Sequence, residues 1–268
     1  MQIKENYTAA DMKRINENKF DGAVGPIYVE GAKQGDALEI SLIDIQTGTW
    51  GWSAILSNFG LLKGRFKEEL VIWNLKNGYA TSRTKFLNGV RIPLKPFLGV
   101  AGTAPRRGEF GMIPPQTFGG NMDNRLFSRG AVLTLPVNQK GALLSLADPH
   151  GAQGDGEVCG TAIETSAEVI LKVNIRKDTK VRYPSLVSRE KFEGNEIVSM
   201  GISPNLKVAA STAVMEMIKQ LEGRGFSPEE GYILCSVAGN LRISEIVDEP
   251  NFVVSVVLPE EVAGQRTQ

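Results

Sequence analysis

Residues 141–175 read GALLSLADPHGAQGDGEVCGTAIETSAEVILKVNI, and this stretch decides the fold class. From Ile163 to Ile175 every second residue is apolar or small, whereas Glu164 and Glu168 belong to the opposite side. This alternation has the two-residue period of a β-strand and not the 3.6-residue period of a helix. The stretch therefore predicts a long strand with one buried face, which follows a polar, glycine-rich loop and a short apolar strand.

Further strand patterns lie on both sides of this stretch. Residues 37–45 (ALEISLIDI) alternate in the same way. Residues 70–73 and 79–84 flank the dipeptide Asn77-Gly78, which favours a β-hairpin because both residues tolerate a positive φ. Other strands are expected at 90–92, 97–100, 130–137, 141–147 and 252–258, with a second hairpin across 138–140.

Helical patterns are few, and most of them lie late in the chain. Residues 206–221 predict the main helix, and Ser227 opens a second helix with a capping box that includes Glu230. Thr8 can cap a short helix over residues 8–18. The buried side of the main helix is expected to contain Val208, Ala209, Thr212, Met215, Met217 and Ile218. The order of elements is mostly β with a late helical segment, and it lacks the regular βαβα alternation of nucleotide-binding folds.

Two segments are expected to be irregular. Residues 103–124 are too rich in Gly and Pro for a regular element. Trp50 and Trp52 flank Gly51 in a predicted loop, where their rings would either line a small pocket or pack in the core.

The composition excludes several classes of function. The 30 Lys and Arg residues balance 30 Asp and Glu residues, which gives no electrostatic case for a nucleic-acid or membrane partner. No apolar run reaches the roughly 18 residues of a spanning helix, and the first residues lack the apolar core of a signal peptide. A cytoplasmic location is therefore expected. Two cysteines are too few for a disulfide framework, and one histidine excludes metal sites that need two from the same chain.

The residues that carry chemistry lie in 147–164, ADPHGAQGDGEVCGTAIE. The only histidine, His150, is surrounded here by Asp148, Asp155, Glu157 and Glu164, with intervening glycines that let the backbone fold tightly. Carboxylates gathered at one strand end repel each other unless a cation lies between them. A bound divalent cation would also lower the pKa of a water molecule towards neutrality. The pattern indicates a metal-assisted hydrolase site in which a carboxylate outside the ligand set acts as the base.

Other interpretations of this segment remain open. Asp-Gly pairs are common in turns, and a lone histidine is often structural, so a glycine-rich turn with solvated acids fits the pattern as well. Cys159 is a candidate nucleophile for a cysteine amidase. Strand parity, however, places Cys159 with Ile163 and Val169, which predicts a small buried hydrophobic residue instead.

A second motif, FGGNMDN at residues 118–124, precedes this segment. Gly119 and Gly120 permit a close approach of the backbone. Asn121 can both donate and accept hydrogen bonds, which suits an amide substrate, and Asp123 is a further possible ligand. By itself the motif is equally compatible with a tight turn or with a loop that covers a site.

Four blocks of the sequence, in this order along the chain, resemble the acetamidase/formamidase family. They are GPIYVEGAKQGDALEISLIDI (25–45), IPLKPFLGVAGTAP (92–105), GGNMDNRLFSRGAVLTLPV (119–137) and GALLSLADPHGAQGDGEVCGTAIE (141–164). The resemblance implies a mainly β, β-sandwich-like fold with a few helices in the C-terminal part. It also implies one domain over residues 1–268, with residues 200–250 as a helical insertion.

The resemblance implies an activity and a cofactor as well. The activity is metal-dependent hydrolysis of short aliphatic amides, of the formamide and acetamide class, to a carboxylate and ammonia. The cofactor is a divalent metal, namely zinc, with calcium as a second or alternative ion. A homodimer or higher homo-oligomer is expected.

Carried over residue by residue, the family pattern assigns a role to each candidate. The metal ligands would be Asp148, His150 and Glu164. Glu157 or Asp155 would act as the base or would orient a ligand, and Asn121 would act on the amide. The substrate-binding residues would be Gly120, Asn121 and Asp123.

The start of the chain departs from the family pattern. Family members have strands before the point that corresponds to Met1-Gln2-Ile3, so this domain is expected to lack these N-terminal strands. The alternative function is therefore a shortened, catalytically weakened family member that acts as a binding or assembly subunit, whose exposed sheet edge a partner would cover.

Overall fold

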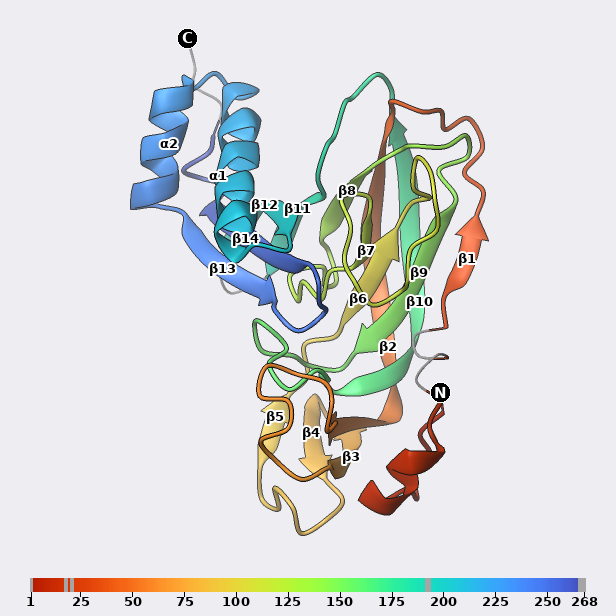
Figure 1. The fold of residues 1–268 in the computed structure, drawn as a ribbon. Helices are drawn as coiled ribbons and strands as arrows, with labels where there is room; N and C mark the ends of the chain where they lie inside the picture. The colour runs from red at the N-terminus through yellow and green to blue at the C-terminus, as the bar shows by residue number, and fades with distance from the viewer. Residues whose placement is uncertain (1, 17–18, 20–21, 191–193, 265–268) are drawn as a thin grey trace.

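Antiparallel β-strands dominate the part of the chain that the structure, a computed structural model, describes: residues 2–16, 19, 22–190 and 194–264 (Figure 1). Fourteen strands of these residues belong to one curled sheet. Its main path runs β13-β14-β12-β11-β8-β2-β10-β9-β6-β7, and β1, β3, β4 and β5 branch from it. The prediction of a mainly β fold with helices near the C-terminus is confirmed.

The elements have the following bounds. The strands are β1 Val24–Ile27, β2 Ala37–Ile55, β3 Glu69–Lys76, β4 Tyr79–Ser82, β5 Arg91–Pro93, β6 Phe97–Gly102, β7 Gly119–Asn121, β8 Val132–Pro136, β9 Leu144–His150, β10 Glu164–Arg176, β11 Ser185–Glu190, β12 Gly194–Ser203, β13 Asn240–Glu245 and β14 Phe252–Pro259. The helices are the 3-10 helix η1 Ala9–Arg14, α1 Leu206–Glu222 and α2 Pro228–Val237.

The long strands β2 and β10 form the centre of the sheet. They pair antiparallel from Ala37 opposite Arg176 to Trp52 opposite Glu164. Alternate residues of β2 enter the main core, and the side chains of Leu38, Ile40 and Leu42 are fully buried. The predicted alternation of residues 162–175 is confirmed, because in β10 exposed residues alternate with more buried ones along the strand.

The strands β12 and β14 are buried on both faces. On one face Val198 and Val257 join the main core, and on the other Ile197 and Val254 pack against the helices. Figure 1 shows α1 and α2 gathered beside these strands, at the opposite end of the molecule from β3, β4 and β5. The buried side of α1 consists of Ala209, Ala213, Met217, Ile218 and Leu221.

The C-terminal helices begin as the sequence predicts, but the buried face of α1 was only partly predicted. The capping box of α2 forms between Ser227 and Glu230. Val208 and Met215, expected inside, are 52% and 53% exposed. Small residues line the contact with β12 instead, because the helix backbone approaches that strand very closely.

Pairing in the middle of the sheet differs from the prediction. The hairpin across Asn77-Gly78 is present, since β3 pairs with β4 and both turn residues have a positive φ. The prediction of a hairpin across 138–140 is wrong, because β8 and β9 do not pair with each other. Strand β8 pairs with β2 and β11, whereas β9 pairs with β1, β6 and β10. Residues 141–143 form a turn with positive φ at each position, which separates the two strands.

Two further local predictions are corrected. The predicted loop at Trp50-Gly51-Trp52 is part of β2, where Gly51 allows the tight approach of β10: a Cβ there would lie 2.6 Å from the carbonyl oxygen of Glu164. The predicted helix over 8–18 is the shorter η1, and residues 17–18 lie outside the described residues.

Gly201 is the point at which α1 touches the sheet. A Cβ at this position would lie 2.0 Å from the carbonyl oxygen of Ala209 and 2.6 Å from the backbone nitrogen of Ala213. Gly201→Ala is expected to lower the free energy of unfolding by about 1–3 kcal/mol, because the helix must move away from β12. Urea denaturation measures this change.

The matched control is Gly111→Ala, whose Cβ would meet only Pro114 Cδ, at 3.9 Å. Equal stability of the two variants would contradict the close packing of α1 on β12.

Candidate metal and active site

His150 lies at the end of β9, and the sheet brings two carboxylates to it. Asp148 and His150 are two residues apart on β9, and Glu164, the first residue of β10, pairs directly with His150. His150 Nε2 lies 3.0 Å from Asp148 Oδ2 and 3.1 Å from Glu164 Oε2. The other oxygen of Glu164 accepts a hydrogen bond from the backbone nitrogen of Ala162 at 2.7 Å, which holds the carboxylate in place.

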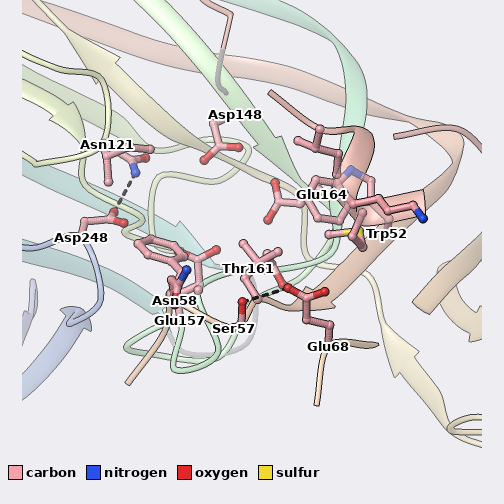
Figure 2. Close-up of a pocket in the computed structure, with 17 residues that line it drawn as sticks. Trp52, Ser57, Asn58, Glu68, Asn121, Asp148, Glu157, Thr161, Glu164 and Asp248 are labelled. Atoms are coloured by element: carbon pink, nitrogen blue, oxygen red, sulfur yellow. Dashed lines mark hydrogen bonds between the residues drawn. The ribbon is translucent and has the colours of Figure 1, made fainter. Parts of the chain in front are cut away.

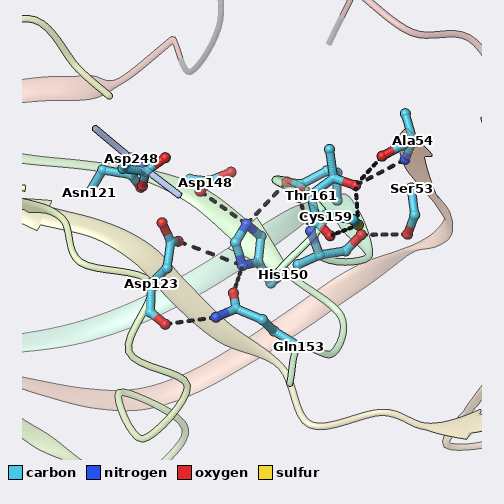
Figure 3. A network of polar contacts seen from close by, with 12 residues as sticks. Ser53, Ala54, Asn121, Asp123, Asp148, His150, Gln153, Cys159, Thr161 and Asp248 are labelled. Atoms are coloured by element: carbon cyan, nitrogen blue, oxygen red, sulfur yellow. Dashed lines mark hydrogen bonds and ion pairs between the residues drawn. The ribbon is translucent and has the colours of Figure 1, made fainter. Parts of the chain in front are cut away.

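A chain of hydrogen bonds sets the tautomer of His150 (Figure 3). The side-chain amide of Gln153 donates from Nε2 to the main-chain oxygen of Asp123 at 2.8 Å, so its Oε1 must face the histidine. Oε1 lies 2.9 Å from His150 Nδ1 and can only accept, which places a proton on Nδ1. In the neutral ring the lone pair of Nε2 therefore points at the two carboxylates.

The strand β6 supplies the floor beneath these carboxylates. A Cβ at Gly99 would lie 2.3 Å from Asp123 Oδ1 and 2.7 Å from Asp148 Oδ2, so only glycine leaves room for both groups. The carbonyl oxygen of Gly99 also accepts hydrogen bonds from the backbone nitrogens of Met122 and Asp123. The position of β6 between β9 and β7 thus brings Asp123 next to His150, with Oδ1 at 3.9 Å from Nδ1.

A second wall comes from the C-terminal part of the chain. Asp248, in the loop between β13 and β14, accepts a hydrogen bond from Asn121 Nδ2 at 2.7 Å. Glu245 accepts hydrogen bonds from the backbone nitrogens of Val247 and Asp248 and so shapes this loop. Glu157 is buried in the loop after β9, which is anchored by the hydrogen bond from Gly156 N to the Ser244 carbonyl.

Three acidic residues of the cluster have a positive φ, a backbone conformation that residues other than glycine rarely adopt. Asp123, Asp148 and Glu157 have φ values of 42°, 58° and 45°. Such residues cost about 1–3 kcal/mol each and persist only where the surrounding structure holds them. Their concentration around one histidine indicates that the arrangement serves a site rather than folding stability.

Burial and mutual repulsion dominate the electrostatics. Burial raises the pKa of Asp123, Glu157 and Asp248 well above the usual range, with further increases from neighbouring carboxylates. Burial raises the pKa of Glu164 to about 7, against the opposing effect of His150.

His150 and Asp148 stabilise each other's charge. Burial lowers the pKa of His150, but the Asp148 and Glu164 carboxylates outweigh this effect and raise it well above its usual value. Burial raises the pKa of Asp148, yet the nearby His150 lowers it below the ordinary value overall. The centre of the cluster therefore needs positive charge, either a proton on Nε2 or a cation in its place.

The donor set fits a divalent metal. One nitrogen and several carboxylate oxygens form three overlapping groups, whose possible ligand atoms lie within 4.8 Å of one another. The groups are Asp123, Asp148 and His150; His150, Glu157 and Glu164; and Asp123, Glu157 and Asp248. Zinc bonds of about 2.0–2.1 Å in a tetrahedral site separate ligand atoms by about 3.3 Å, close to the contacts of His150 Nε2. Both oxygens of Asp123 are buried without a hydrogen-bond partner in the described structure.

The cluster opens into a cavity of about 440 Å³ (Figure 2). Asn121, Asp148, Glu157, Glu164 and Asp248 line one side of it. The remaining wall comes from η1, from the end of β2 and the segment between β2 and β3, and from Ile113, Gly160 and Thr161. The site is therefore accessible to a small molecule while its acidic groups stay largely out of water.

The structure gathers most of the residues that the sequence singled out. Asp148, His150, Glu164, Glu157, Asn121 and Asp123 converge on one centre. Gly120 adjoins Asn121 in β7 but is not among the residues that line the cavity.

Asp155 and Cys159 lie elsewhere. Asp155 is bound by Arg125 Nε and Arg242 Nε, both at 2.8 Å, and does not line the cavity, so it ties the loop to β13. The burial predicted for Cys159 is wrong: it is exposed and its Sγ contacts Thr161. Strand parity does not reach it because β10 begins only at Glu164.

Four residues of the site were not predicted: Gly99, Gln153, Glu245 and Asp248. The three acidic residues within 245–249 (EIVDE), shortly before the apolar segment 252–258, are a signal that could have drawn attention to Asp248. Nothing in the sequence alone indicates that β6 passes beneath the cluster at Gly99.

Comparisons with known proteins found similar sequences and similar structures. The model of the Acetamidase/Formamidase family matches residues 1–110 and 107–265. A formamidase from Methylophilus methylotrophus is 27% identical, over 97% of this chain and 81% of its own length. The crystal structure of an acetamidase from Bacillus halodurans superimposes with a TM-score of 0.86 at 32% identity, covering 96% of this chain and 84% of that chain. A predicted acetamidase/formamidase from Thermoanaerobacter tengcongensis gives 0.82 at 31% identity, covering 95% and 86%.

The space at Gly99 can be tested directly. Gly99→Ala is expected to weaken zinc binding at least about tenfold, because the added methyl group displaces Asp123 and Asp148. Isothermal titration of zinc into chelator-treated protein measures the affinity, and a melting curve without metal reports any loss of folding.

Gly154→Ala, in the neighbouring loop, is the control, since an added Cβ there has no heavy atom within 4 Å. Equal zinc affinity of the two variants would show that the carboxylates above Gly99 do not hold the ion.

Proposed function

Since this chain belongs to the Acetamidase/Formamidase family and is a hydrolase of linear amides, we propose that its buried cluster hydrolyses short aliphatic amides with the help of a divalent cation. The substrates are of the formamide and acetamide class, and the products are a carboxylate and ammonia. The observation that carries the proposal is the contact of His150 Nε2 with both Asp148 and Glu164. Three groups that all offer lone pairs meet there, beside an open cavity.

The cation would be held by Asp148, His150 and Glu164. Mixed nitrogen and oxygen ligands suit zinc, which in such a site polarises a carbonyl group and lowers the pKa of water. The neighbouring group of Asp123, Glu157 and Asp248 offers oxygen only, the ligand type that calcium prefers. A calcium ion there would occupy Glu157, so we place the cation needed for the reaction at His150 and treat calcium as a second or alternative ion.

Asn121 is assigned to recognition of the amide. Its Nδ2 is used by Asp248, which leaves Oδ1 buried, without a partner among the described residues, at the wall of the cavity. A carbonyl oxygen in this position accepts a hydrogen bond from the NH₂ group of a primary amide. Gly120 pairs with Ala101 of β6, and its neighbour Gly119 lets β7 pass close to β6, because a Cβ there would lie 2.3 Å from the carbonyl oxygen of Ala101. The pair Asn121–Asp248 thus orients the leaving nitrogen.

Glu157 is assigned to proton transfer. Its carboxyl lines the cavity, and burial together with Asp123 raises its pKa. A carboxyl group in such surroundings can take a proton from the attacking water and pass it to the departing ammonia. Asp155 does not share this role, because two arginines neutralise it outside the cavity.

The alternative of a catalytically weakened binding subunit is not favoured. Such a subunit would have no need for a convergent, strained and buried cluster at the wall of a cavity. We keep the part of this alternative that concerns assembly, and we propose that the enzyme forms a homodimer or higher homo-oligomer. The sheet ends at β13, and apolar residues on α2 and β13 are 59–73% exposed: Tyr232, Ile233, Val237 and Leu241.

The location of the protein rests on the sequence. Among the residues that the structure describes, no helix combines the length and the apolar character needed to cross a membrane. A cytoplasmic location stays a prediction.

Removal of the metal tests the role of the cluster. Protein supplied with zinc is expected to release ammonia from formamide and acetamide, and treatment with a chelator is expected to abolish the release. Zinc added back should restore it, because the unpaired carboxylates regain their cation. Equal ammonia release before and after chelation would contradict a metal-dependent reaction.

The base is tested by two matched changes of carboxylate to carboxamide. Glu157→Gln is expected to lower kcat about 10²- to 10⁴-fold, because the proton carrier is lost while the proposed ligands Asp148, His150 and Glu164 stay intact. Asp155→Asn, two residues earlier, should keep kcat within about threefold, and its loss of ion pairs should appear as a lower melting temperature.

Steady-state ammonia release and metal content are measured for both variants. A Glu157→Gln enzyme with unchanged kcat, or an Asp155→Asn enzyme that is inactive while folded, would overturn the assignment of the base.

A further inference from the structure

The cavity is much larger than the amides that the family names suggest. Formamide and acetamide have three and four heavy atoms, whereas a cavity of about 440 Å³ belongs to the range that holds drug-sized ligands. We propose that the outer part of this cavity is an acyl-binding channel, and that the preferred substrates are primary amides with a bulky apolar acyl group, such as arylalkyl amides. The inference rests on the proposed amide hydrolysis, and it makes larger primary amides, rather than formamide and acetamide, the preferred substrates of that reaction.

Acidic residues line the reacting end of the channel, and the remainder is lined by apolar residues together with Lys13, Ser57, Asn58, Glu68 and Thr161. The reacting end is formed by the acidic cluster, and Figure 2 shows Asn121, Asp148 and Glu164 around the same space as Trp52. The apolar lining consists of Met12, Ile15, Trp52, Leu56, Phe59 and Ile113. Trp52 pairs directly with Glu164 across β2 and β10, so the apolar wall begins beside the reacting carbon. An acyl chain would leave the cluster along this wall.

The apolar wall is built before any ligand binds. Met12 and Trp52 belong to a buried cluster with Leu70 and Ile72 of β3. The ring of Phe59 lies against Gly160, where a Cβ would be only 2.4 Å from Phe59 Cδ1. A preformed wall of this kind binds a chain without the entropy cost of ordering its own side chains.

Trp52 contributes apolar ring surface to the wall. The residue is only 8% exposed. Its Nε1 is buried and has no hydrogen-bond partner within the described part of the chain. Because this N–H is buried away from the cavity surface, the indole offers a bound acyl group apolar area and no hydrogen bond. A methyl group, the whole acyl side chain of acetamide, offers this wall little apolar area.

One lining residue of the channel lies close to the junction between the two matches of the family model. The family model matches in two pieces that meet at residues 107–110, and Ile113 of the following loop lines the cavity. The alignment with the formamidase extends over 334 positions, more than the 268 residues of this chain, so the relative carries segments that are absent here. The lining at Ile113 therefore belongs to a loop next to this junction.

A substrate series tests the inference. The ratio kcat/KM is measured by ammonia release for formamide, acetamide, butyramide and 3-phenylpropanamide with the zinc-loaded full chain. Each methylene that leaves water for an apolar wall contributes up to about fourfold. We expect kcat/KM for 3-phenylpropanamide to exceed that for acetamide at least tenfold.

A matched pair of variants locates the effect. Leu56→Trp narrows the channel and should lower the preference for 3-phenylpropanamide over acetamide at least tenfold. Leu62→Trp, in the same loop but 58% exposed and not among the lining residues, should keep the preference of the unmodified enzyme. If Leu56→Trp does not fold, as judged by circular dichroism, Ile113→Trp takes its place.

The outcomes separate the two proposals. An enzyme that hydrolyses acetamide at least as efficiently as 3-phenylpropanamide, or a preference that Leu56→Trp leaves within twofold, overturns the acyl channel and leaves the amidase function intact. Absence of ammonia release from every amide in the series overturns the proposed function, and the channel with it.

Discussion

The site depends on one cross-strand pair, His150 of β9 opposite Glu164 of β10. With Asp148 on the same face of β9, this pair puts one imidazole nitrogen within about 3 Å of two carboxylate oxygens. Gln153 fixes the tautomer that leaves the nitrogen lone pair among these acids. Groups that all offer electron pairs stay together in a buried place only if positive charge lies between them. A zinc ion held by Asp148, His150 and Glu164 would supply this positive charge and would lower the pKa of water at the same point.

The rest of the fold serves to keep that arrangement in place. The floor at Gly99 makes room for Asp123 and Asp148, and the C-terminal strands deliver Asp248 from far along the chain. Asp123, Asp148 and Glu157 are held at positive φ, a cost that the long pairing of β2 with β10 and the buried core can sustain. The protein thus loses some folding free energy to hold these acidic side chains in a fixed arrangement. Such preorganisation lets an active site work without rearrangement.

The same frame gives the two ends of the cavity different chemistry. Asp148, Glu157 and Glu164 line the acidic end. The strand β2 continues past the core and presents Trp52 to the other part of the cavity. A curled sheet lets one strand serve both purposes: its first half fills the core with Leu38, Ile40 and Leu42, and its second half builds the wall of the site. Acyl specificity and catalysis are therefore linked through the register of β2 and β10.

The sequence by itself determined the β class, the hairpin at Asn77-Gly78, the C-terminal helices and the central segment from Asp148 to Glu164, because these follow from local periodicity, turn chemistry and a lone histidine among acids. It also determined the family, through four blocks of residues. It did not determine which strands pair: β8 and β9 look like a hairpin, yet each pairs with distant partners. Nor did it separate Glu157, which enters the cavity, from Asp155, which two arginines hold outside. Those outcomes depend on contacts between residues far apart along the chain, and only the tertiary structure decides them, because long-range packing sets strand order and the direction of each side chain.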